Sequence, residues 1–348
     1  MPHYNIGWDI GGAHLKAAVV DADGSVLKVM QQPCPLWKGM NWLEKAVKTL
    51  QAELPKVPCR HVVTMTGELV DLFDHREQGV ETIIAALSTL LPVADLWVYA
   101  GRLGILSARA VLPEHYSAIA SANWLASASY AAGKLGKGLL VDIGSTTTDI
   151  ILFSEGRVQA QGLTDYQRLV SFELVYTGIV RTAVMAVAQE VLFKACKVGL
   201  MAEYFATMAD VYRLTGELNE AHDQAESADG GAKTVSASAR RLARMIGCEY
   251  ADFDFDDWRQ LAFDLRARQL DKIAQSCKSH AARGRLLPQE PFVGAGVGRF
   301  LVKQLAAGLG HDYVDFNDLL PQTCVQSAST PADCAPAIAI ALSASGAC

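Results

Sequence analysis

The stretch LLVDIGSTTTDIILF, residues 139–153, has apolar residues at both ends and a polar group in the middle. Asp142 precedes Gly144, four hydroxyl residues follow at 145–148, and Asp149 comes just before the second apolar run. A strand buried along its whole length would have to find a hydrogen-bond partner for each of these side chains. We therefore interpret the stretch as two strands joined by a turn that displays small polar groups.

The same pattern occurs near the start of the chain, in GWDIGGAHLKAAVVDADGSVLKV at residues 7–29. When this segment is aligned with residues 140–162, Asp9 falls on Asp142, Gly11 on Gly144, Gly12 on Ser145 and Lys16 on Asp149. Both segments predict a β-hairpin, with glycine at the first bend and a second glycine turn further on. The repeat indicates two lobes built on one plan, which also suits a chain of 348 residues.

The segments between and after the hairpins predict an α/β protein. Between the hairpins helical and strand patterns alternate, with helices expected at 41–54, 79–91 and 117–135 and strands at 60–67 and 95–100. From Tyr166 onward helical periodicity dominates, at 166–193, 202–218, 236–247 and 256–284, with Gly216 and Gly247 near helix C-termini. A strand, a glycine turn and a helix return at 290–310, followed by a strand at 312–316 and an apolar helix at 334–344.

The composition argues against several classes of partner. A net charge of −6 and the lack of any Lys/Arg block disfavour nucleic acid. No apolar run is long enough for a membrane span, and the first residues lack the basic and apolar regions of a secretion signal. The cysteines show no CxxC pair and no zinc-finger spacing, so we expect reduced thiols in a cytoplasmic protein, with a disulfide framework as the alternative; they are residues 34, 59, 196, 248, 277, 324, 334 and 348.

The glycine turns suggest an anion site. A glycine after a strand lets the backbone approach a ligand closely and direct N–H groups at it, an arrangement that suits phosphate. The carboxylates of Asp9, Asp142 and Asp149 repel phosphate unless a hydrated Mg²⁺ lies between them. Hydroxyls at 145–148 can then donate to phosphate oxygens, and Lys16 adds positive charge. Each turn alone is also explained as an ordinary loop cap, but their duplication favours the phosphate interpretation.

A third glycine-rich turn, VGAGVG at residues 293–298, contains Gly294, Gly296 and Gly298. It resembles the dinucleotide motif GxGxxG only loosely, and Asp315 follows about twenty residues later, so a Rossmann site stays open as an alternative. We favour a turn that covers an adenine or another planar group.

Three segments, DIGGAHLK (9–16), VDIGSTTTDI (141–150) and FVGAGVGRFL (292–301), resemble the two phosphate motifs and the adenosine motif of the actin, hexokinase and Hsp70 ATPase superfamily. Their order and spacing match. The resemblance implies two RNase-H-like lobes with a cleft between them and a last helix that returns to the first lobe. The expected divisions are a first lobe at 1–137, a second lobe at 138–324 with a helical insert at 166–285, and the C-terminal helix at 325–348.

Further motifs resemble the hydantoinase/oxoprolinase-related branch of that superfamily. Within it they are most similar to the synthases of methanofuran biosynthesis, which also occur near tetrahydromethanopterin-linked C1-transfer genes. The resemblance spans nearly the whole chain and rests on TMTGELVDLF (64–73), CPLWKG (34–39), YTGIVRT (176–182), EYFATMADVYRLTG (203–216) and the segment 228–247.

The resemblance implies a transferase that forms an aryl alkyl ether. Such an enzyme joins a furanmethyl diphosphate to the phenol oxygen of a glutamylated tyramine or tyrosine and releases diphosphate. On this hypothesis Mg²⁺ is the cofactor, ATP is not required, and the partners are small molecules, with a homo-oligomer left open. Lys16 would neutralise charge and Asp9, Asp142 and Asp149 would position the metal, while phosphates would be held by Gly11, Gly12, Gly144, Ser145, Thr146 and Thr147.

Other candidate residues have two explanations each. His14, which stands with Leu15 where the family has a small Asn/Thr pair, either donates to a phosphate or is an ordinary turn residue. Glu68 and Asp210 are the candidates for the base that takes the phenol proton, although a loop acid such as Glu68 is more commonly a solvated surface residue. Tyr176 and Arg181 are candidates for binding the amino-acid end of a substrate, and Arg181 can equally make a weak surface ion pair.

Two other functions are alternatives, and the first of them would use the same residues. One is an ATP-dependent kinase or a hydantoinase/oxoprolinase-like enzyme that passes through an acyl phosphate. The other is a nucleotide-gated binding or regulatory protein, which is disfavoured because the chain has no added peptide-binding domain, no helix-turn-helix extension and no basic face. The acidic run DFDFDDW (252–258) resembles a metal cluster, but negative charge at the start of the following helix explains it more simply.

Overall fold

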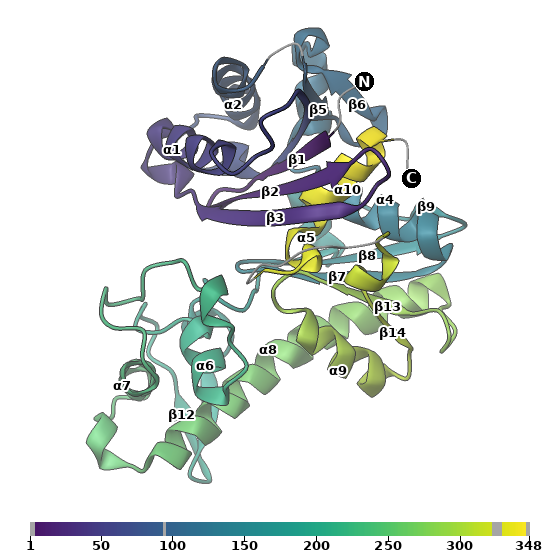
Figure 1. Ribbon diagram of the computed structural model, residues 1–348. Coiled ribbons are helices and arrows are strands. Elements are labelled where there is room, and N and C mark those ends of the chain that lie inside the picture. Colours follow the sequence, from purple (N-terminus) through teal and green to yellow (C-terminus); the bar gives the residue numbers. More distant parts are fainter. Residues whose placement is uncertain (1–3, 93–94, 322–328, 346–348) are drawn as a thin grey trace. The chain divides into compact units, whose positions relative to one another are not determined.

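The computed structural model of the chain describes residues 4–92, 95–321 and 329–345 (Figure 1). The chain divides into two compact units, which are described separately below. The first comprises Met1–Gly138, Leu152–Gln167 and Asp315–Cys348, and the second comprises Leu139–Ile151 and Arg168–Val314. The predicted boundary between residues 324 and 325 lies outside the described residues.

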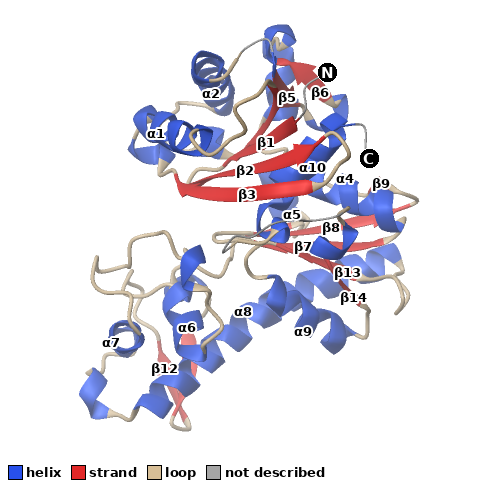
Figure 2. Ribbon diagram, viewed as in Figure 1, coloured by secondary structure: helices blue, strands red, loops and turns tan. Residues whose placement is uncertain are grey.

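The first unit contains a six-stranded sheet in the order β3-β2-β1-β4-β5-β6 (Figure 2). The first three strands form an antiparallel meander, and β4 and β5 then continue parallel to β1. The meander is the predicted hairpin with one further strand, and it turns at the glycines of DIGG and DADG. The strands are β1 (Tyr4–Ile10), β2 (His14–Asp21), β3 (Val26–Pro33), β4 (Cys59–Met65), β5 (Leu96–Tyr99) and β6 (Ile105–Ser107).

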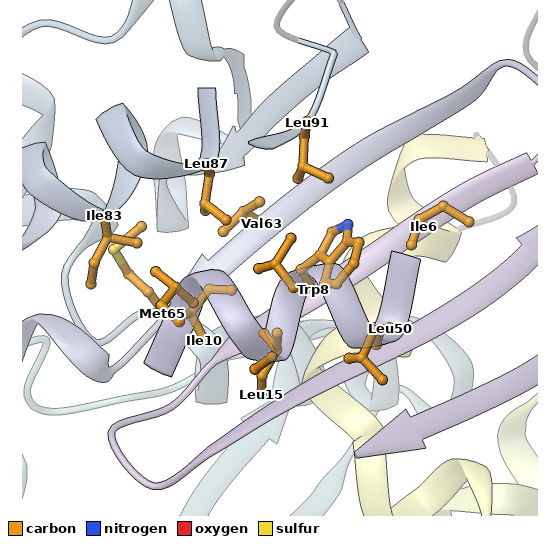
Figure 3. Packing of buried hydrophobic residues seen from close by; sticks show 14 of the residues in the cluster. Ile6, Trp8, Ile10, Leu15, Leu50, Val63, Met65, Ile83, Leu87 and Leu91 are labelled. Atoms are coloured by element: carbon orange, nitrogen blue, oxygen red, sulfur yellow. The ribbon is translucent and has the colours of Figure 1, made fainter. Parts of the chain in front are cut away.

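One face of this sheet carries the main apolar core, shown in Figure 3. Alternate residues of β1 point to this face, because successive side chains of a strand lie on opposite sides. They are Ile6, Trp8 and Ile10, and each is fully buried against residues of α1 (Met40–Gln51) and α2 (Arg76–Leu90). The helical spacing of the apolar residues in these two helices therefore gives each of them one core-facing side.

The opposite face of β1 is covered by the C-terminal helix α10 (Ala335–Ser345), which also contacts α4 (Asn123–Leu135). The approach is very close at Gly7, where a Cβ atom would lie 1.8 Å from the backbone oxygen of Ala337. Only glycine fits there. Asp9 points to the same face as Gly7, so α4 and α10 determine the surroundings of this acid.

The second unit repeats the strand order of the first. Its sheet runs β10-β8-β7-β13-β14, with β9 paired to β8. The hairpin β7–β8 corresponds to β1–β2, and β13 lies parallel to β7 as β4 lies parallel to β1. The matching orders confirm the prediction of an α/β protein with two RNase-H-like lobes. The strands of this sheet are β7 (Gly138–Ile143), β8 (Thr148–Ser154), β9 (Arg157–Val158), β10 (Leu174–Val175), β13 (Phe292–Ala295) and β14 (Tyr313–Asp315). The end of β8 and all of β9 lie in residues 152–167, which are assigned to the first unit.

Between β10 and β13 the second unit contains a small hairpin and three helices, and α9 follows β13. Gly216 and Gly247 adopt the left-handed conformation directly after α6 and near the end of α7, as predicted. Asp254 precedes α8, and Asp256 and Asp257 lie in its first turn, which confirms the helix-start interpretation of the acidic run. The elements are β11 (Glu190–Phe193), β12 (Cys196–Gly199), α6 (Met208–Thr215), α7 (Val235–Met245), α8 (Phe255–Gly284) and α9 (Arg299–Leu309).

Two helix predictions are wrong. Within 166–193 only α5 (Asp165–Val170) is helical, because the residues around Gly178 use their backbone N–H groups to bind another turn, as described below. The expected helix at 117–135 is interrupted between α3 (Tyr116–Ile119) and α4, where Ser121 has a positive φ of 52°. In the part of the chain that is described, no helix combines the length and the apolar character needed to cross a membrane.

Candidate functional site

The first glycine turn, residues 11–13, joins β1 to β2. It is closed by the Gly11 N–H, which donates to the His14 carbonyl at 2.9 Å. The Gly12 carbonyl accepts from the Leu36 N–H at 2.9 Å, and the Ala13 carbonyl accepts from the Cys34 N–H at 2.8 Å. Segment 34–39, one of the motifs that carries the family resemblance, therefore supports this turn through its backbone.

A second supporting segment, residues 66–70, packs on the other side of the same turn. The Thr66 N–H donates to the Ile10 carbonyl at 2.9 Å, and a Cβ atom on Gly67 would lie 3.1 Å from that oxygen. Glu68 follows directly in the 3-10 helix η2 (Gly67–Leu69). The motif TMTGELVDLF thus brings an acid to the edge of the first turn.

Asp9 and Lys16 are directly opposite each other in the β1–β2 register, so their side chains share one face of the sheet. Asp9 is 6% exposed and accepts a hydrogen bond from Asn123 Nδ2 at 3.3 Å. Lys16 Nζ donates to the Asp333 backbone carbonyl at 2.7 Å. The sheet therefore places two residues of the predicted site, the acidic Asp9 and the positively charged Lys16, side by side within the first unit.

Glu68 is not the solvated loop acid that residue statistics favour, because its side chain is 1% exposed. Its Oε1 lies 2.9 Å from Ser121 Oγ, and that hydroxyl lies 3.0 Å from Asp165 Oδ2. Asp165 is also paired with Arg76, at 3.1 Å between Nη2 and Oδ2. The pKa of Glu68 is raised to about 7, mainly by burial, with the neighbouring negative charge of Asp165 acting in the same direction.

The second glycine turn, residues 144–147, joins β7 to β8 and is closed by the Gly144 N–H, which donates to the Thr147 carbonyl at 2.8 Å. The Gly144 carbonyl accepts from the Ile179 N–H, and the Ser145 carbonyl accepts from the N–H groups of Val180 and Arg181, at 2.9 to 3.1 Å. In a trans peptide the next N–H points opposite to the carbonyl. The N–H groups of Ser145 and Thr146 therefore point away from this supporting segment.

Segment 176–182 is packed tightly under the turn. A Cβ atom on Gly178 would lie 2.5 Å from the Thr146 nitrogen and 2.6 Å from the Gly144 oxygen, so any larger residue would displace the turn. Thr148 Oγ1 donates to the Thr177 carbonyl at 2.7 Å, and Arg181 Nη1 lies 3.5 Å from Thr146 Oγ1. The motif YTGIVRT thus both holds the turn and brings a guanidinium to it.

Ser145 has a buried hydroxyl with no hydrogen-bond partner among the described residues. A buried hydroxyl without a partner is costly, so this position indicates a ligand that the protein itself does not supply. The hydroxyl lies in the turn whose N–H groups point away from segment 176–182. These features fit an anion such as phosphate.

The third glycine turn packs directly against the second within the same unit. Gly296 has a φ of 77°, and a Cβ atom there would lie 2.3 Å from Asp142 Oδ1. A Cβ atom on Gly298 would lie 2.5 Å from the Ile143 side chain, and one on Gly294 would lie 2.7 Å from the Tyr313 ring. Packing alone accounts for these glycines, and the adenine interpretation stays a prediction.

The two acids that flank the second turn have different surroundings. Asp142, the last residue but one of β7, lies beside Gly296 and is half-buried. Asp149, on β8, forms an ion pair with Arg168, whose side chain is 3% exposed against 17% for Asp149. The predicted metal role of Asp149 would therefore compete with a buried arginine.

Three further candidates lie in the second unit. Arg181 contacts the second turn as described above, whereas Tyr176 is 64% exposed. Asp210 is 1% exposed and is engaged on both oxygens, since Oδ2 caps α6 through the Thr207 N–H and Oδ1 accepts from Ser238 and Arg241. This carboxylate holds α6 to α7, and we leave it out of the proposed chemistry.

A magnesium site fits the donor chemistry at the second turn only if water and substrate phosphate supply most of the ligands. No group of three or more His, Cys, Asp or Glu side chains is gathered to hold a metal within residues 4–92, 95–321 and 329–345. Mg²⁺ commonly binds proteins through one or two carboxylates and takes its remaining ligands from water and substrate phosphate. Asp142, next to the turn with the unpartnered Ser145 hydroxyl, matches that pattern.

Sequence reasoning missed Ser121, Asp165, Arg76 and Asn123. None of them belongs to a glycine turn, and Ser121 falls inside a segment that was expected to be one continuous helix. The acids and the serine are brought together only by the packing of α2, α4 and α5 around η2.

The comparisons with known proteins agree with the motifs. A family model described as hydantoinase/oxoprolinase matches residues 60–333. The chain is 29% identical over 299 residues to (4-{4-[2-(gamma-L-glutamylamino)ethyl]phenoxymethyl}furan-2-yl)methanamine synthase of Methanocaldococcus jannaschii, covering 86% of this chain and 87% of that protein. It is 27% identical over 171 residues to the protein of the same name from Methanococcus vannielii, covering 49% of this chain and 75% of that one.

Among solved structures, nucleotide-free acetone carboxylase shares the fold with a TM-score of 0.57 at 12% identity, covering 97% of this chain and 70% of that one. The resemblance inferred from the sequence motifs is confirmed by the family model, which spans well over half of the residues. The chain belongs to the hydantoinase/oxoprolinase family.

Proposed function

We propose that this protein forms an aryl alkyl ether in the biosynthesis of a methanofuran- or methylofuran-type cofactor. The phenol oxygen of a glutamylated tyramine or tyrosine attacks the methylene carbon of a furanmethyl diphosphate. The bond from that carbon to the diphosphate oxygen breaks, the ether bond forms, and the phenol proton passes to a base. The observation that carries the proposal is the similarity to the Methanocaldococcus jannaschii synthase, which extends over 87% of that protein.

The second unit supplies groups suited to the leaving diphosphate. The N–H groups of Ser145 and Thr146, the buried Ser145 hydroxyl and the Arg181 guanidinium surround the glycine turn. Hydrogen-bond donors that are already oriented stabilise negative charge as it develops, without reorganisation. Thr147 and Gly144 shape the turn. Mg²⁺ bound by Asp142 would supply further positive charge to the departing diphosphate. Asp9 is proposed separately as a metal ligand of the first unit.

The first unit supplies the base. Glu68 is buried beside the first glycine turn, and its pKa of about 7 suits proton transfer near neutral pH. A carboxyl group at its ordinary pKa would be a weaker base at that pH. Lys16 lies beside Asp9, and Gly11, Gly12 and His14 form the turn, which we propose as a second anion site.

An ATP-dependent kinase or hydrolase is the second candidate. Acetone carboxylase, which shares the fold, acts in ATP-dependent acetone carboxylation, and the same turns would serve a nucleotide. Both enzymes need phosphate binding, so the turns alone do not distinguish them. The two candidates differ in the product released, which is diphosphate for the synthase and ADP for the ATP-dependent enzyme.

The test is to incubate the purified protein with furanmethyl diphosphate and γ-glutamyl-tyramine, with and without Mg²⁺ and ATP. We expect ether product by mass spectrometry and an equal amount of diphosphate, in the absence of any nucleotide. Replacing γ-glutamyl-tyramine by tyramine, tyrosine or γ-glutamyl-tyrosine, and comparing the rates of ether formation, identifies the phenol substrate. Strict dependence on ATP with formation of ADP would replace the synthase by the second candidate. Cell fractionation and gel filtration test the proposed cytoplasmic location and homo-oligomer.

A further inference from the structure

Ser121 lies between two carboxyl groups of the first unit. Its Oγ is 2.9 Å from Glu68 Oε1 and 3.0 Å from Asp165 Oδ2. A serine hydroxyl carries one hydrogen, so it can donate to only one of these oxygens at a time. The other contact is a hydrogen bond only if that carboxyl group is itself protonated and donates to Ser121.

The surroundings identify which carboxyl group carries the proton. Asp165 Oδ2 is 3.1 Å from Arg76 Nη2, and this positive neighbour favours the ionised form of the aspartate. Glu68 is almost completely buried, and burial raises its pKa to about 7. The hydrogen bonds therefore run in one direction, from the Glu68 carboxyl group to Ser121 and from the Ser121 hydroxyl to the Asp165 carboxylate.

One end of this chain of hydrogen bonds is open. Glu68 Oε2 is buried and has no hydrogen-bond partner among the described residues. Since an unpaired buried oxygen is unfavourable, the position points to a donor that arrives with a ligand. The other end reaches the surface, because the Asp165 and Arg76 side chains are 16% and 36% exposed.

We propose that Glu68, Ser121 and Asp165 form a proton relay that carries the phenol proton of the substrate from a buried site to water. The identity of the proton donor rests on the proposed function; the relay itself does not. The phenol gives its proton to Glu68 Oε2 as its oxygen bonds to carbon. Glu68 passes the proton on Oε1 to Ser121 Oγ, and Ser121 passes its own to Asp165 Oδ2. Asp165 releases a proton to water, and rotation of the Glu68 carboxyl group restores the starting state.

The backbone is built to hold these three groups together. Ser121 has a φ of 52°, a left-handed conformation that is uncommon for residues other than glycine. Gly79 of α2 lies so close to η2 that a Cβ atom would be 2.6 Å from the Glu68 backbone oxygen. Because α2 also begins with Arg76, a single helix positions both the acid and the counter-ion of the relay.

The groups that influence the Glu68 proton come from three elements packed around it. They are Arg76 of α2, Asp165 of α5 and the Ser121 hydroxyl between α3 and α4. Asp165 raises the pKa of Glu68 and Arg76 lowers it. In the arrangement above Ser121 accepts the Glu68 proton, so removing either Ser121 or Asp165 should destabilise protonated Glu68 and move its titration to lower pH.

The relay can be tested on the protein without substrate, by infrared difference spectroscopy as a function of pH. We expect a protonated-carboxyl band that titrates near neutral pH and is absent in Glu68→Gln. Asp165→Asn and Ser121→Ala should both shift this titration to lower pH, because the first removes a negative neighbour and the second removes the acceptor of the Glu68 proton. Ser121→Gly, which suits the positive φ, provides a second variant if Ser121→Ala folds poorly. Glu81→Gln, an exposed acid on α2, is the matched control and should leave the band unchanged.

The role in catalysis is tested by the pH profile of ether formation. Ser121→Gly and Asp165→Asn should lower the rate at least tenfold and shift the profile with the infrared titration, whereas a purely structural role would not move the profile. A Glu68 that stays ionised from pH 6 to 8, or a shift to higher pH in either variant, would overturn the relay. If the band behaves as expected but no ether forms, the relay stands and the proposed function fails.

Discussion

The two glycine turns share one backbone plan, but the groups around them differ. The first turn is supported by segments 34–39 and 66–70 and lies next to the buried acid Glu68. The second is supported by segment 176–182 and lies next to Arg181, with an unpartnered Ser145 hydroxyl. Duplication therefore explains the turns, whereas the supporting segments give one unit groups for proton transfer and the other groups for binding negative charge.

The aligned positions Lys16 and Asp149 carry opposite charges. We expect the largest effect of a substitution at Asp149. Asp149→Asn would leave the buried guanidinium of Arg168 without its carboxylate, so we expect a loss of about 3–5 kcal/mol in unfolding free energy. Urea denaturation measures the loss. Glu190→Gln, in an exposed pair with Lys197, is the control and should change stability by less than about 1 kcal/mol. Normal stability with lost activity would instead assign Asp149 to the metal.

Asp142, the acid on the other side of the second turn, is expected to affect the reaction instead of the fold. If it holds Mg²⁺ against the diphosphate, Asp142→Ala should lower the rate of diphosphate release by about 10²–10³-fold, comparable to losing one group that stabilises transition-state charge. Initial rates with excess Mg²⁺ provide the measurement, and thermal unfolding provides the control. Full activity in this variant would remove the metal–phosphate hypothesis.

The packing of the supporting segments predicts that alanine in place of glycine destabilises the second turn more than the first. In Gly178→Ala the new methyl group would meet backbone atoms of residues 144–146, so we expect a loss of about 1–3 kcal/mol and weaker diphosphate binding. Gly12→Ala should be milder, because its Cβ would meet only the end of the Val70 side chain at 2.9 Å. Gly308→Ala, in helix α9 with nothing within 4 Å, is the control and should stabilise by about 1 kcal/mol. Calorimetry with diphosphate and thermal unfolding would detect these differences, and equal effects at 178 and 12 would contradict the comparison.

Acidification should affect the two units differently. In the first unit, burial lowers the pKa of His61 from 6.5 to about 4. The folded first unit therefore loses the stability contributed by neutral His61 as pH falls from 6.5 towards 4. Glu68 acts in the opposite sense, because its pKa is raised from 4.5 to about 7, and its folded form gains protons as pH falls through that range. In the second unit His280 has a lowered pKa, caused first by burial.

We therefore expect a change from pH 7 to 5.5 to lower the stability of the second unit by more than that of the first, with His61 and Glu68 largely offsetting each other. Hydrogen exchange followed by mass spectrometry, corrected for the intrinsic rate, resolves peptides of each unit. In Glu68→Gln the first unit should become acid-sensitive as well. If the first unit is equally sensitive to acid in the unaltered protein and in Glu68→Gln, then His61 and Glu68 do not compensate for each other.

The hairpins, their turns and the strand–helix alternation could be predicted because their signals are local: a glycine bend between apolar runs, repeated twice. The burial of Glu68 could not, since it depends on how α2 packs at Gly79 and on Ser121, which is distant in sequence. The helix expected across 166–193 stops at Val170 for a related reason. Its apolar spacing favours a helix, but the N–H groups of 179–181 bind the carbonyls of residues 144 and 145 instead.

The contact between Gly7 and Ala337 also has a consequence for how the chain is made. The first strand of the first unit packs against a helix at the other end of the sequence, so this contact has nearly the largest sequence separation that the chain allows. Closing such a loop is entropically costly and slow. During synthesis β1 must wait until α10 leaves the ribosome before its second face is covered. The second unit, whose residues all precede that helix, is free to fold first, and the first unit is the one exposed to chaperones and proteases in the interval.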